Sequence, residues 1–447
     1  MKKERFLNFV QDNILSMFTG SEIVGEEESS SRDACVAQGA GGALLIKFDR
    51  NDTYRFVVKR VQPFKNFELS LVKSIIEEVG VIYNNKVSDD FIKGLEGLVI
   101  EKAICKALSS SSSTTLATLI SSINQWGLRT YEGKKTQFGF IITNKICGKQ
   151  TNINLHISRI LKRDFSALLS DGKNTCIELS RDGYLTGYIS LPKAENQNLL
   201  APYKFLKMAN LCNGAKIGVC LLTEGDILIF KDKTLLFAKR NGKWVSFAHE
   251  EIIGKLSDRS DEVEEVRRAI YLSALDLSFS KDGGCIVHVN NGDKFNVLKH
   301  INATDVLYKD CYDFIEQETI NQSFFRMVDE WENEIPTFEN FIQEERCVKS
   351  ANLIKIINGR KFQELDRKLR LELLGIDGAT IIDYDGNILA VGAIIKIEAG
   401  SLGGGRLAAA KTLSNYGISI KVSADGSIEG FKMDKNKLRV KPIFIIG

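Results

Sequence analysis

The sequence predicts an α/β protein with a mixed β-sheet flanked by helices in its C-terminal domain and a separate N-terminal α/β domain. Three observations support this prediction. Short apolar stretches bounded by turn residues recur along the chain, stretches of helical periodicity lie between them, and 447 residues are enough for about two to three domains. We place the domain boundary at residue 200, which gives domains over 1–200 and 201–447, the second with a helical insertion near 290–345.

The N-terminal domain begins with an amphipathic helix. Its apolar residues recur at helical spacing with polar residues between them: Phe6, Phe9, Val10, Ile14 and Phe18. The acidic, serine-rich stretch over 25–31 then predicts a loop. The apolar stretches over 42–48 and 54–61 predict a buried strand and its hairpin partner.

Helices and strands follow through the rest of this domain. Helical periodicity covers 67–79 and 91–108, and the serine run over 109–113 predicts an exposed loop or a helix break. Strand-like stretches lie at 138–143 and 175–179. No motif in this domain indicates a function.

The C-terminal domain starts with a predicted three-stranded meander over 226–247, which includes the Asn-Gly pair typical of tight hairpins. Apolar residues three or four apart predict a helix over 263–277, and 285–289 is strand-like. A mostly helical segment over 324–374 follows, with Pro336 starting a new helix and Gly359 interrupting it.

The last quarter of the chain is predicted to consist of short strands, tight turns and one Ala-rich helix over 406–413. The predicted strands lie at 380–383, 387–391, 393–398, 418–422 and 428–431. Basic residues near the end of the chain predict a solvated edge: Lys432, Lys435, Lys437, Arg439 and Lys441.

Composition excludes several classes of protein. The 60 Lys and Arg nearly balance the 57 Asp and Glu, so the chain lacks the clustered positive charge that non-specific nucleic-acid binding requires. No apolar run of about 18 residues occurs, so no membrane-spanning helix is expected. Nine cysteines without a Cys-x-x-Cys pair predict reduced thiols and a cytoplasmic location, and the four histidines have no metal-ligand spacing.

Asp377-Gly378-Ala379 is the first candidate for chemistry, placed where a helical segment meets a predicted strand. A carboxylate beside glycine at a strand start could hold a divalent cation, since glycine lets a ligand approach the backbone closely. The alternative is a structural turn, because Asp-Gly pairs are common in turns. On the tripeptide alone, the turn is the stronger interpretation.

The second candidate is the glycine run Gly403-Gly404-Gly405 before Arg406 and the Ala-rich helix. Consecutive glycines at a helix start leave backbone N–H groups free to bind an anion, and the helix dipole adds positive potential. Arg406 could form a bidentate pair with a phosphate. The alternative is a loop before a helix that packs through its small residues, and in isolation the two interpretations weigh equally.

The order of these elements and motifs resembles the catalytic domain of diadenylate cyclases, over about residues 262–431. Those enzymes join two ATP molecules into cyclic di-AMP. In that family an Asp-Gly-Ala motif supplies a metal-binding aspartate that activates a ribose 3′-hydroxyl. A Gly-Thr-Arg-His-Arg-Ala-Ala motif binds phosphates, and a Val-Ser-Glu-Glu stretch adds a metal-facing acid.

The resemblance implies a role for each matching residue of this chain. Asp377 would be the catalytic residue and, with Asp425, a metal ligand. The nucleotide-binding residues would be Gly378, Ala379, Gly403, Gly404, Gly405, Arg406 and Ser423. The ligand would be ATP or a cyclic dinucleotide, with Mg²⁺ or Mn²⁺ as the cofactor of an active enzyme.

The chain departs from the family at charged positions. Gly405 and Leu407 replace two arginines, Arg406 replaces a histidine, and Ala424 and Asp425 replace two glutamates. Each lost guanidinium removes a charge-assisted contact of about 1.5–3 kcal/mol. Nucleotide binding tolerates that loss better than phosphoryl transfer, where developing charge needs fixed cations.

The leading hypothesis is therefore a nucleotide-binding sensor or regulator with a small nucleotide as its partner and no membrane partner. An active diadenylate cyclase is the alternative, and a scaffold with a purely structural glycine loop is the third hypothesis. Since catalysis in the family needs two domains face to face, a homo-oligomer is left open.

Overall fold

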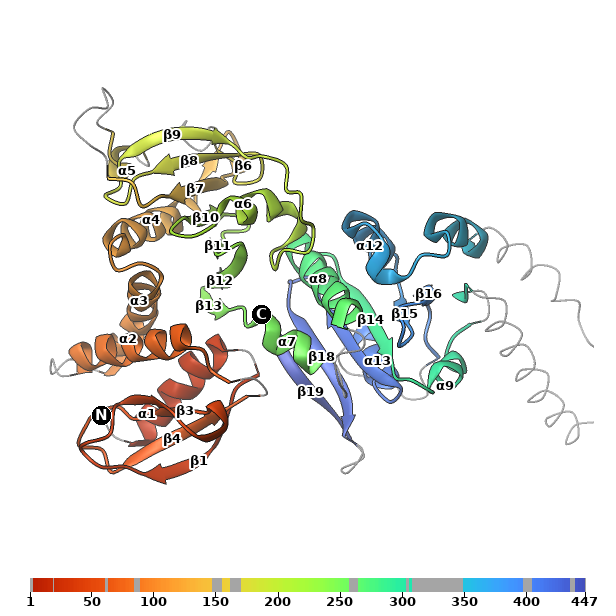
Figure 1. The fold of residues 1–447 in the computed structure, drawn as a ribbon, viewed down its shortest axis with the longest axis horizontal. Helices are drawn as coiled ribbons and strands as arrows, with labels where there is room; N and C mark the ends of the chain where they lie inside the picture. Colours follow the sequence, from red (N-terminus) through yellow and green to blue (C-terminus); the bar gives the residue numbers. More distant parts are fainter. Residues whose placement is uncertain are drawn as a thin grey trace, which may run out of the picture. The chain divides into compact units, whose positions relative to one another are not determined.

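The structure, a computed structural model, describes residues 3–18, 20–60, 63–83, 89–146, 155–160, 170–256, 264–302, 305–307, 349–396, 404–434 and 439–446. It is a mixed α/β protein that divides into two compact units, Met1–Gly254 and Lys255–Gly447 (Figure 1). This division lies beyond the predicted boundary at residue 200. The physical reason is that strands from both sides of residue 200 pair in one sheet.

The first unit begins with a helix and a four-stranded antiparallel sheet. The helix, α1 (Lys3–Phe9), continues as the π-helical turn η1 (Val10–Leu15), and the predicted apolar face is buried. The sheet has the order β1-β4-β3-β2 and consists of β1 (Glu22–Glu28), β2 (Val36–Gln38), β3 (Leu44–Ile46) and β4 (Tyr54–Lys59). The predicted hairpin over 42–61 is confirmed, since β3 and β4 pair antiparallel.

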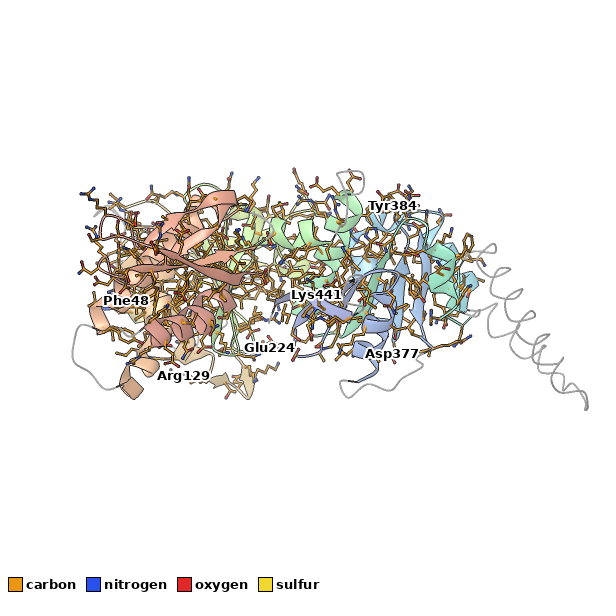
Figure 2. All side chains as sticks on the ribbon, turned by 90° about the horizontal axis from the view of Figure 1, so that it is seen from below. Phe48, Arg129, Glu224, Asp377, Tyr384 and Lys441 are labelled. Atoms are coloured by element: carbon orange, nitrogen blue, oxygen red, sulfur yellow. The ribbon has the colours of Figure 1, made fainter. Side chains whose placement is uncertain are left out.

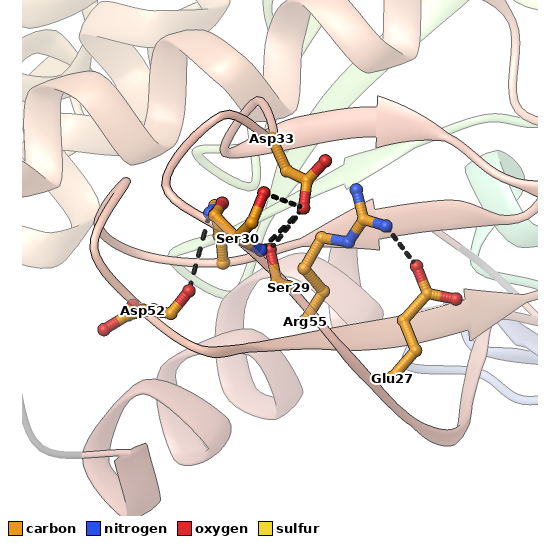
Figure 3. A network of polar contacts seen from close by, with 7 residues as sticks. Glu27, Ser29, Ser30, Asp33, Asp52 and Arg55 are labelled. Carbon is orange, nitrogen blue, oxygen red and sulfur yellow. Dashed lines mark hydrogen bonds and ion pairs between the residues drawn. The ribbon is translucent and has the colours of Figure 1, made fainter.

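The prediction of a loop over 25–31 was wrong, because most of this stretch belongs to β1. The acidic strand is stabilised by basic residues on its neighbours. Glu27 stands opposite Arg55 on β4 and pairs with its Nη2 at 2.6 Å (Figure 3). Glu26 pairs with Lys3 of α1. The chain turns only at Ser29 and Ser30, whose polar groups donate to the Asp33 carboxylate.

Helices then lead to a seven-stranded sheet. They are α2 (Asn66–Tyr83), α3 (Asp89–Leu108) and α4 (Ser113–Trp126). The first two confirm the predicted helical stretches, and the serine run is the break between α3 and α4. The helix α4 and the short strand pair β5 (Thr130–Tyr131) and β6 (Lys134–Lys135) were not predicted from the sequence.

The seven-stranded sheet has the order β13-β12-β11-β10-β7-β8-β9. Its strands are β7 (Phe138–Ile142), β8 (Thr175–Leu179), β9 (Leu185–Ser190), β10 (Ile217–Leu221), β11 (Ile227–Lys231), β12 (Thr234–Arg240) and β13 (Lys243–Ser246), and the short helices beside it are α5 (Ile157–Ile160), η4 (Tyr203–Phe205) and α6 (Leu206–Leu211). The predicted meander is confirmed as β11 to β13. One continuous hydrophobic core joins this sheet to the four-stranded sheet, which makes 1–254 a single unit.

The second unit contains a six-stranded mixed sheet of order β16-β15-β14-β17-β18-β19, in which only β14 and β15 run parallel. The strands are β14 (Gly284–Val289), β15 (Ala379–Ile382), β16 (Ile388–Ala393), β17 (Gly417–Val422), β18 (Ile428–Asp434) and β19 (Arg439–Ile446). The helices are α8 (Glu264–Ser280), α9 (Lys294–Leu298), a helix over 349–357, η6 (Phe362–Glu364), α12 (Arg367–Leu374) and α13 (Gly405–Leu413). The helix α7 (His249–Lys255) belongs to the first unit except for its last residue.

Two predictions for this unit need correction. The strand predicted over 393–398 is absent from the described part, because β16 ends at Ala393 and only an isolated bridge joins Ile395 to Ile301. The basic end of the chain forms an edge strand, β19, which sequence analysis described only as a solvated edge. Most of the predicted insertion over 290–345, including Pro336, lies outside the described residues. Gly359 does end a helix, with a φ of 68°.

Candidate active site at one edge of the six-stranded sheet

Four chain segments meet at one edge of the six-stranded sheet. The parallel strands β14 and β15 begin there, and their antiparallel neighbours β17 and β16 end there. As a result Gly283, before β14, and Asp377, before β15, share this edge with Ser423, after β17. Tyr384 follows β15 and lies at the opposite edge, away from Asp377 (Figure 2).

A pocket of about 310 Å³ lies at this edge. Its lining residues are Cys285, Asp377, Gly378, Ala379, Ala393, Ile394, Ile395, Gly405, Arg406 and Ala409. The structure therefore brings together Asp377, Gly378 and Ala379 of the first candidate with Gly405 and Arg406 of the second. The remaining lining residues are small or apolar, and no sequence motif distinguishes them from ordinary core residues.

Asp377 and Arg406 form an ion pair in this pocket. The Arg406 Nη2 donates to the Asp377 Oδ1 at 3.3 Å. The Arg406 side chain is 44% exposed, and the Asp377 side chain is 90% exposed. Exposed pairs of this kind contribute at most about 1 kcal/mol to stability. Both charged groups thus remain accessible to a ligand from solvent.

Gly283 lies against the guanidinium of Arg406. A Cβ atom at Gly283 would lie 2.3 Å from the Arg406 Nη1. A side chain at this position would force the guanidinium to shift, so the glycine allows Arg406 to lie directly against the backbone that leads into β14.

The N-terminus of α13 faces the same pocket through Gly405 and Arg406. The N-cap residue Gly404 has a φ of 85° and no side chain to cap the helix, so the first N–H groups have no side-chain acceptor from the N-cap. The positive end of the helix dipole adds to the Arg406 charge. Gly403, which was predicted to bind nucleotide, lies outside the described residues.

Cys285 contributes a thiol to the wall of the pocket. Burial raises the pKa of Cys285 to about 12, and the Arg406 charge opposes this shift only in part. The thiol is therefore neutral at physiological pH, and because a nucleophilic cysteine must be a thiolate, Cys285 serves as a small apolar wall residue.

Ser423 and Asp425 do not line the pocket. They form the turn between β17 and β18, in which the Gly426 N–H donates to the Ser423 carbonyl oxygen and the Ser427 N–H donates to Asp425 Oδ1. The predicted metal role of Asp425 beside Asp377 stays a prediction. Within the described ranges, no three His, Cys, Asp or Glu side chains gather as a metal-binding group.

A second pocket, of about 280 Å³, lies within the first unit. Its lining residues are Arg60, Lys65, Phe67, Glu68, Leu200, Thr234, Leu236, Ser246, Phe247, Ala248, His249, Glu250 and Glu251. Arg60 and Glu68 form a buried bidentate ion pair at 2.9 and 2.6 Å in its wall. No sequence motif indicates this pocket, because its residues come from dispersed segments that only the tertiary structure brings together.

Comparisons of the chain with protein-family models, with curated proteins and with solved structures find no match. In the part of the chain that the structure describes, no helix combines the length and the apolar character needed to cross a membrane.

Proposed function

We propose that the 310 Å³ pocket binds the phosphates of a nucleotide, ATP or a cyclic dinucleotide, and that the protein is a nucleotide-binding sensor or regulator. One observation carries the proposal: the Arg406 guanidinium and the first turn of α13 meet Asp377 across one pocket. The resemblance of this segment to diadenylate cyclases supports a nucleotide as the ligand.

The residues around the pocket suit the parts of such a ligand. A phosphate accepts hydrogen bonds from the Arg406 fork and from the N–H groups that begin α13. The apolar side chains of Ile394, Ile395 and Ala409 offer a surface for the base or ribose. Mg²⁺ commonly binds one or two protein carboxylates together with phosphate oxygens, and the exposed Asp377 carboxylate fits that pattern.

We propose nucleotide binding in preference to catalysis because the pocket has little positive charge, and phosphoryl transfer needs fixed cations near the phosphates. Gly405 and Leu407 stand where the resembling enzymes place arginines, so Arg406 is the one guanidinium among the described residues that line the pocket. An active diadenylate cyclase remains the alternative. It would need a second copy of this domain to face the first with another ATP, and Asp377 would then act on the ribose 3′-hydroxyl.

Calorimetry on the full chain tests the proposal, with ATP and cyclic di-AMP titrated in the presence of Mg²⁺. We expect Arg406→Ala to weaken binding about tenfold or more, because a charge-assisted contact of about 1.5–3 kcal/mol is lost. Arg439→Ala is the matched control, since Arg439 lies on the edge strand β19 of the same sheet, is exposed and does not line the pocket. Equal binding by Arg406→Ala and the wild type would exclude this pocket as the nucleotide site.

Incubation with ATP and Mn²⁺, followed by chromatography of the products, tests the alternative. A cyclic dinucleotide product whose rate per molecule rises with protein concentration would replace the sensor with an active cyclase. Unchanged ATP, together with binding in the calorimeter, supports the sensor.

A further inference from the structure

We propose that the Asp377–Arg406 ion pair couples the binding of an anion to the binding of a divalent cation in this pocket. The inference rests on the proposed function, because it concerns how the same site responds to its ligands. The carboxylate suited to a cation and the guanidinium suited to a phosphate form an ion pair with each other in the structure.

The contacts of the pair show why it is adjustable. Arg406 uses one N–H for Asp377, its fork has further donors, and Gly283 leaves room for the guanidinium against the backbone. Asp377 is 90% exposed and has Arg406 as its one side-chain partner among the described residues. Either group can therefore exchange its partner for a ligand without rearranging the sheet edge.

The coupling follows from competition. An anion that binds Arg406 must displace Asp377, and a cation that binds Asp377 must displace Arg406. Once one ligand is bound, its site residue no longer competes for the other ligand, so each ligand strengthens the binding of the other by the same factor. The strength of an exposed ion pair sets that factor at about two- to fivefold.

The experiment measures anion and cation binding separately, on the full chain. ATP and pyrophosphate are titrated with EDTA present, and Mn²⁺ is titrated alone by electron paramagnetic resonance. We expect Asp377→Asn to bind ATP and pyrophosphate about two- to fivefold more tightly than the wild type in EDTA, because Arg406 is released. With Mg²⁺ present the order inverts, because the variant has lost its cation ligand. Arg406→Gln should likewise bind Mn²⁺ more tightly than the wild type.

Asp282→Asn is the matched control for a simple change in charge. Asp282 is exposed and precedes Gly283, the residue against which Arg406 lies, but it does not line the pocket. Its replacement removes one negative charge near the pocket and keeps the ion pair. We expect anion affinity in EDTA to stay within experimental error of the wild type, and an increase equal to that of Asp377→Asn would overturn the coupling.

The outcomes separate the inference from the proposed function. If ATP binds to the wild type but Asp377→Asn gains no affinity in EDTA, the coupling is wrong and the nucleotide site stands. If pyrophosphate and Mn²⁺ show the coupling but neither ATP nor cyclic di-AMP binds, the coupling stands and the nucleotide assignment fails. If none of these probes binds, both are overturned.

Discussion

Gly378 and Gly392 lie in such close contact that a Cβ atom on Gly378 would stand 2.5 Å from the carbonyl carbon of Gly392. Gly378 also has a φ of 116°, a conformation that residues with side chains rarely adopt. The Asp-Gly pair therefore lies in a tight bend just before β15. The same bend places Asp377 at the pocket, so a structural role for the glycine is compatible with a functional role for the aspartate.

Replacing Gly378 with alanine should destabilise the β15–β16 hairpin by about 3 kcal/mol or more, because backbone strain and a steric clash add. Gly404→Ala is the matched control. Gly404 also has a positive φ, of 85°, but a Cβ there meets open space, so only strain of about 1–2 kcal/mol is expected. Hydrogen exchange of peptides from β15 and β16 reports the local stability. Equal protection in the two variants would contradict the clash.

Arg367 and Asp276 join α12 to α8 through a fully buried bidentate ion pair, with Nε–Oδ2 and Nη2–Oδ1 distances of 2.6 and 2.8 Å. Asp276→Asn should cost about 3–5 kcal/mol, since it leaves the guanidinium buried without its counter-charge. Glu264→Gln, in the exposed Glu264–Arg268 pair of α8, should cost no more than about 0.5 kcal/mol. Urea unfolding followed by circular dichroism compares the two, and similar midpoints would show that the buried pair is dispensable.

Buried thiols should make the protein sensitive to alkali. Burial raises the pKa of three thiols from 9.0 to about 12, those of Cys105, Cys176 and Cys285. It raises the pKa values of the Cys212 and Cys220 thiols further. A raised pKa in the folded state means that the unfolded chain loses its protons first. The stabilisation is therefore complete below pH 9 and is lost as the pH rises toward 12.

Thermal unfolding at pH 8, 10 and 11 checks this expectation. For each affected thiol, the free energy of unfolding should fall by at most about 1.4 kcal/mol per pH unit above pH 9. Cys285→Ser separates the thiol effect from other titrating groups, because its stability should fall less steeply with pH than that of the wild type. Parallel pH profiles for the two proteins would count against the prediction for Cys285.

Asp305 binds the backbone of the pocket-lining residue Ile394. Its Oδ2 accepts the Ile394 N–H at 3.1 Å, and its Oδ1 accepts Lys349 Nζ at 2.8 Å, while the same Nζ donates to the Gly392 carbonyl at 3.1 Å. Asp305→Ala should cost about 1–3 kcal/mol through the unsatisfied groups it leaves and should weaken nucleotide binding through the displaced wall. Asp305→Asn, whose amide oxygen can still accept from Ile394, should recover part of both losses. Unfolding and calorimetry measure them, and wild-type values for Asp305→Ala would rule out this positioning role.

Local patterns predicted much of the secondary structure. The helix α8, the hairpin of β15 and β16, and the helix α13 follow from apolar spacing and turn residues that lie within a few positions of one another. Where partners lie far apart in the sequence, the predictions were wrong or missing. The acidic strand β1 depends on basic residues of α1 and β4, which lie far from it in the sequence. The edge strand β19 pairs with the strand just before it, β18, and was missed for another reason: its first residues are basic and largely exposed, so they lack the apolar alternation of a strand.

The same distinction between local motifs and contacts of distant residues applies to the candidate site. An Asp-Gly pair and an arginine at a glycine-preceded helix start are local motifs, so both could be predicted as candidate ligand-binding groups. The ion pair between Asp377 and Arg406, which are 29 positions apart, could not be predicted from local motifs, and neither could the contribution of Cys285 and Ile394 to the pocket or the place of Asp425 in a separate turn. The physical reason is the mixed direction of the strands, which brings the starts of β14 and β15 and the ends of β16 and β17 to a single edge.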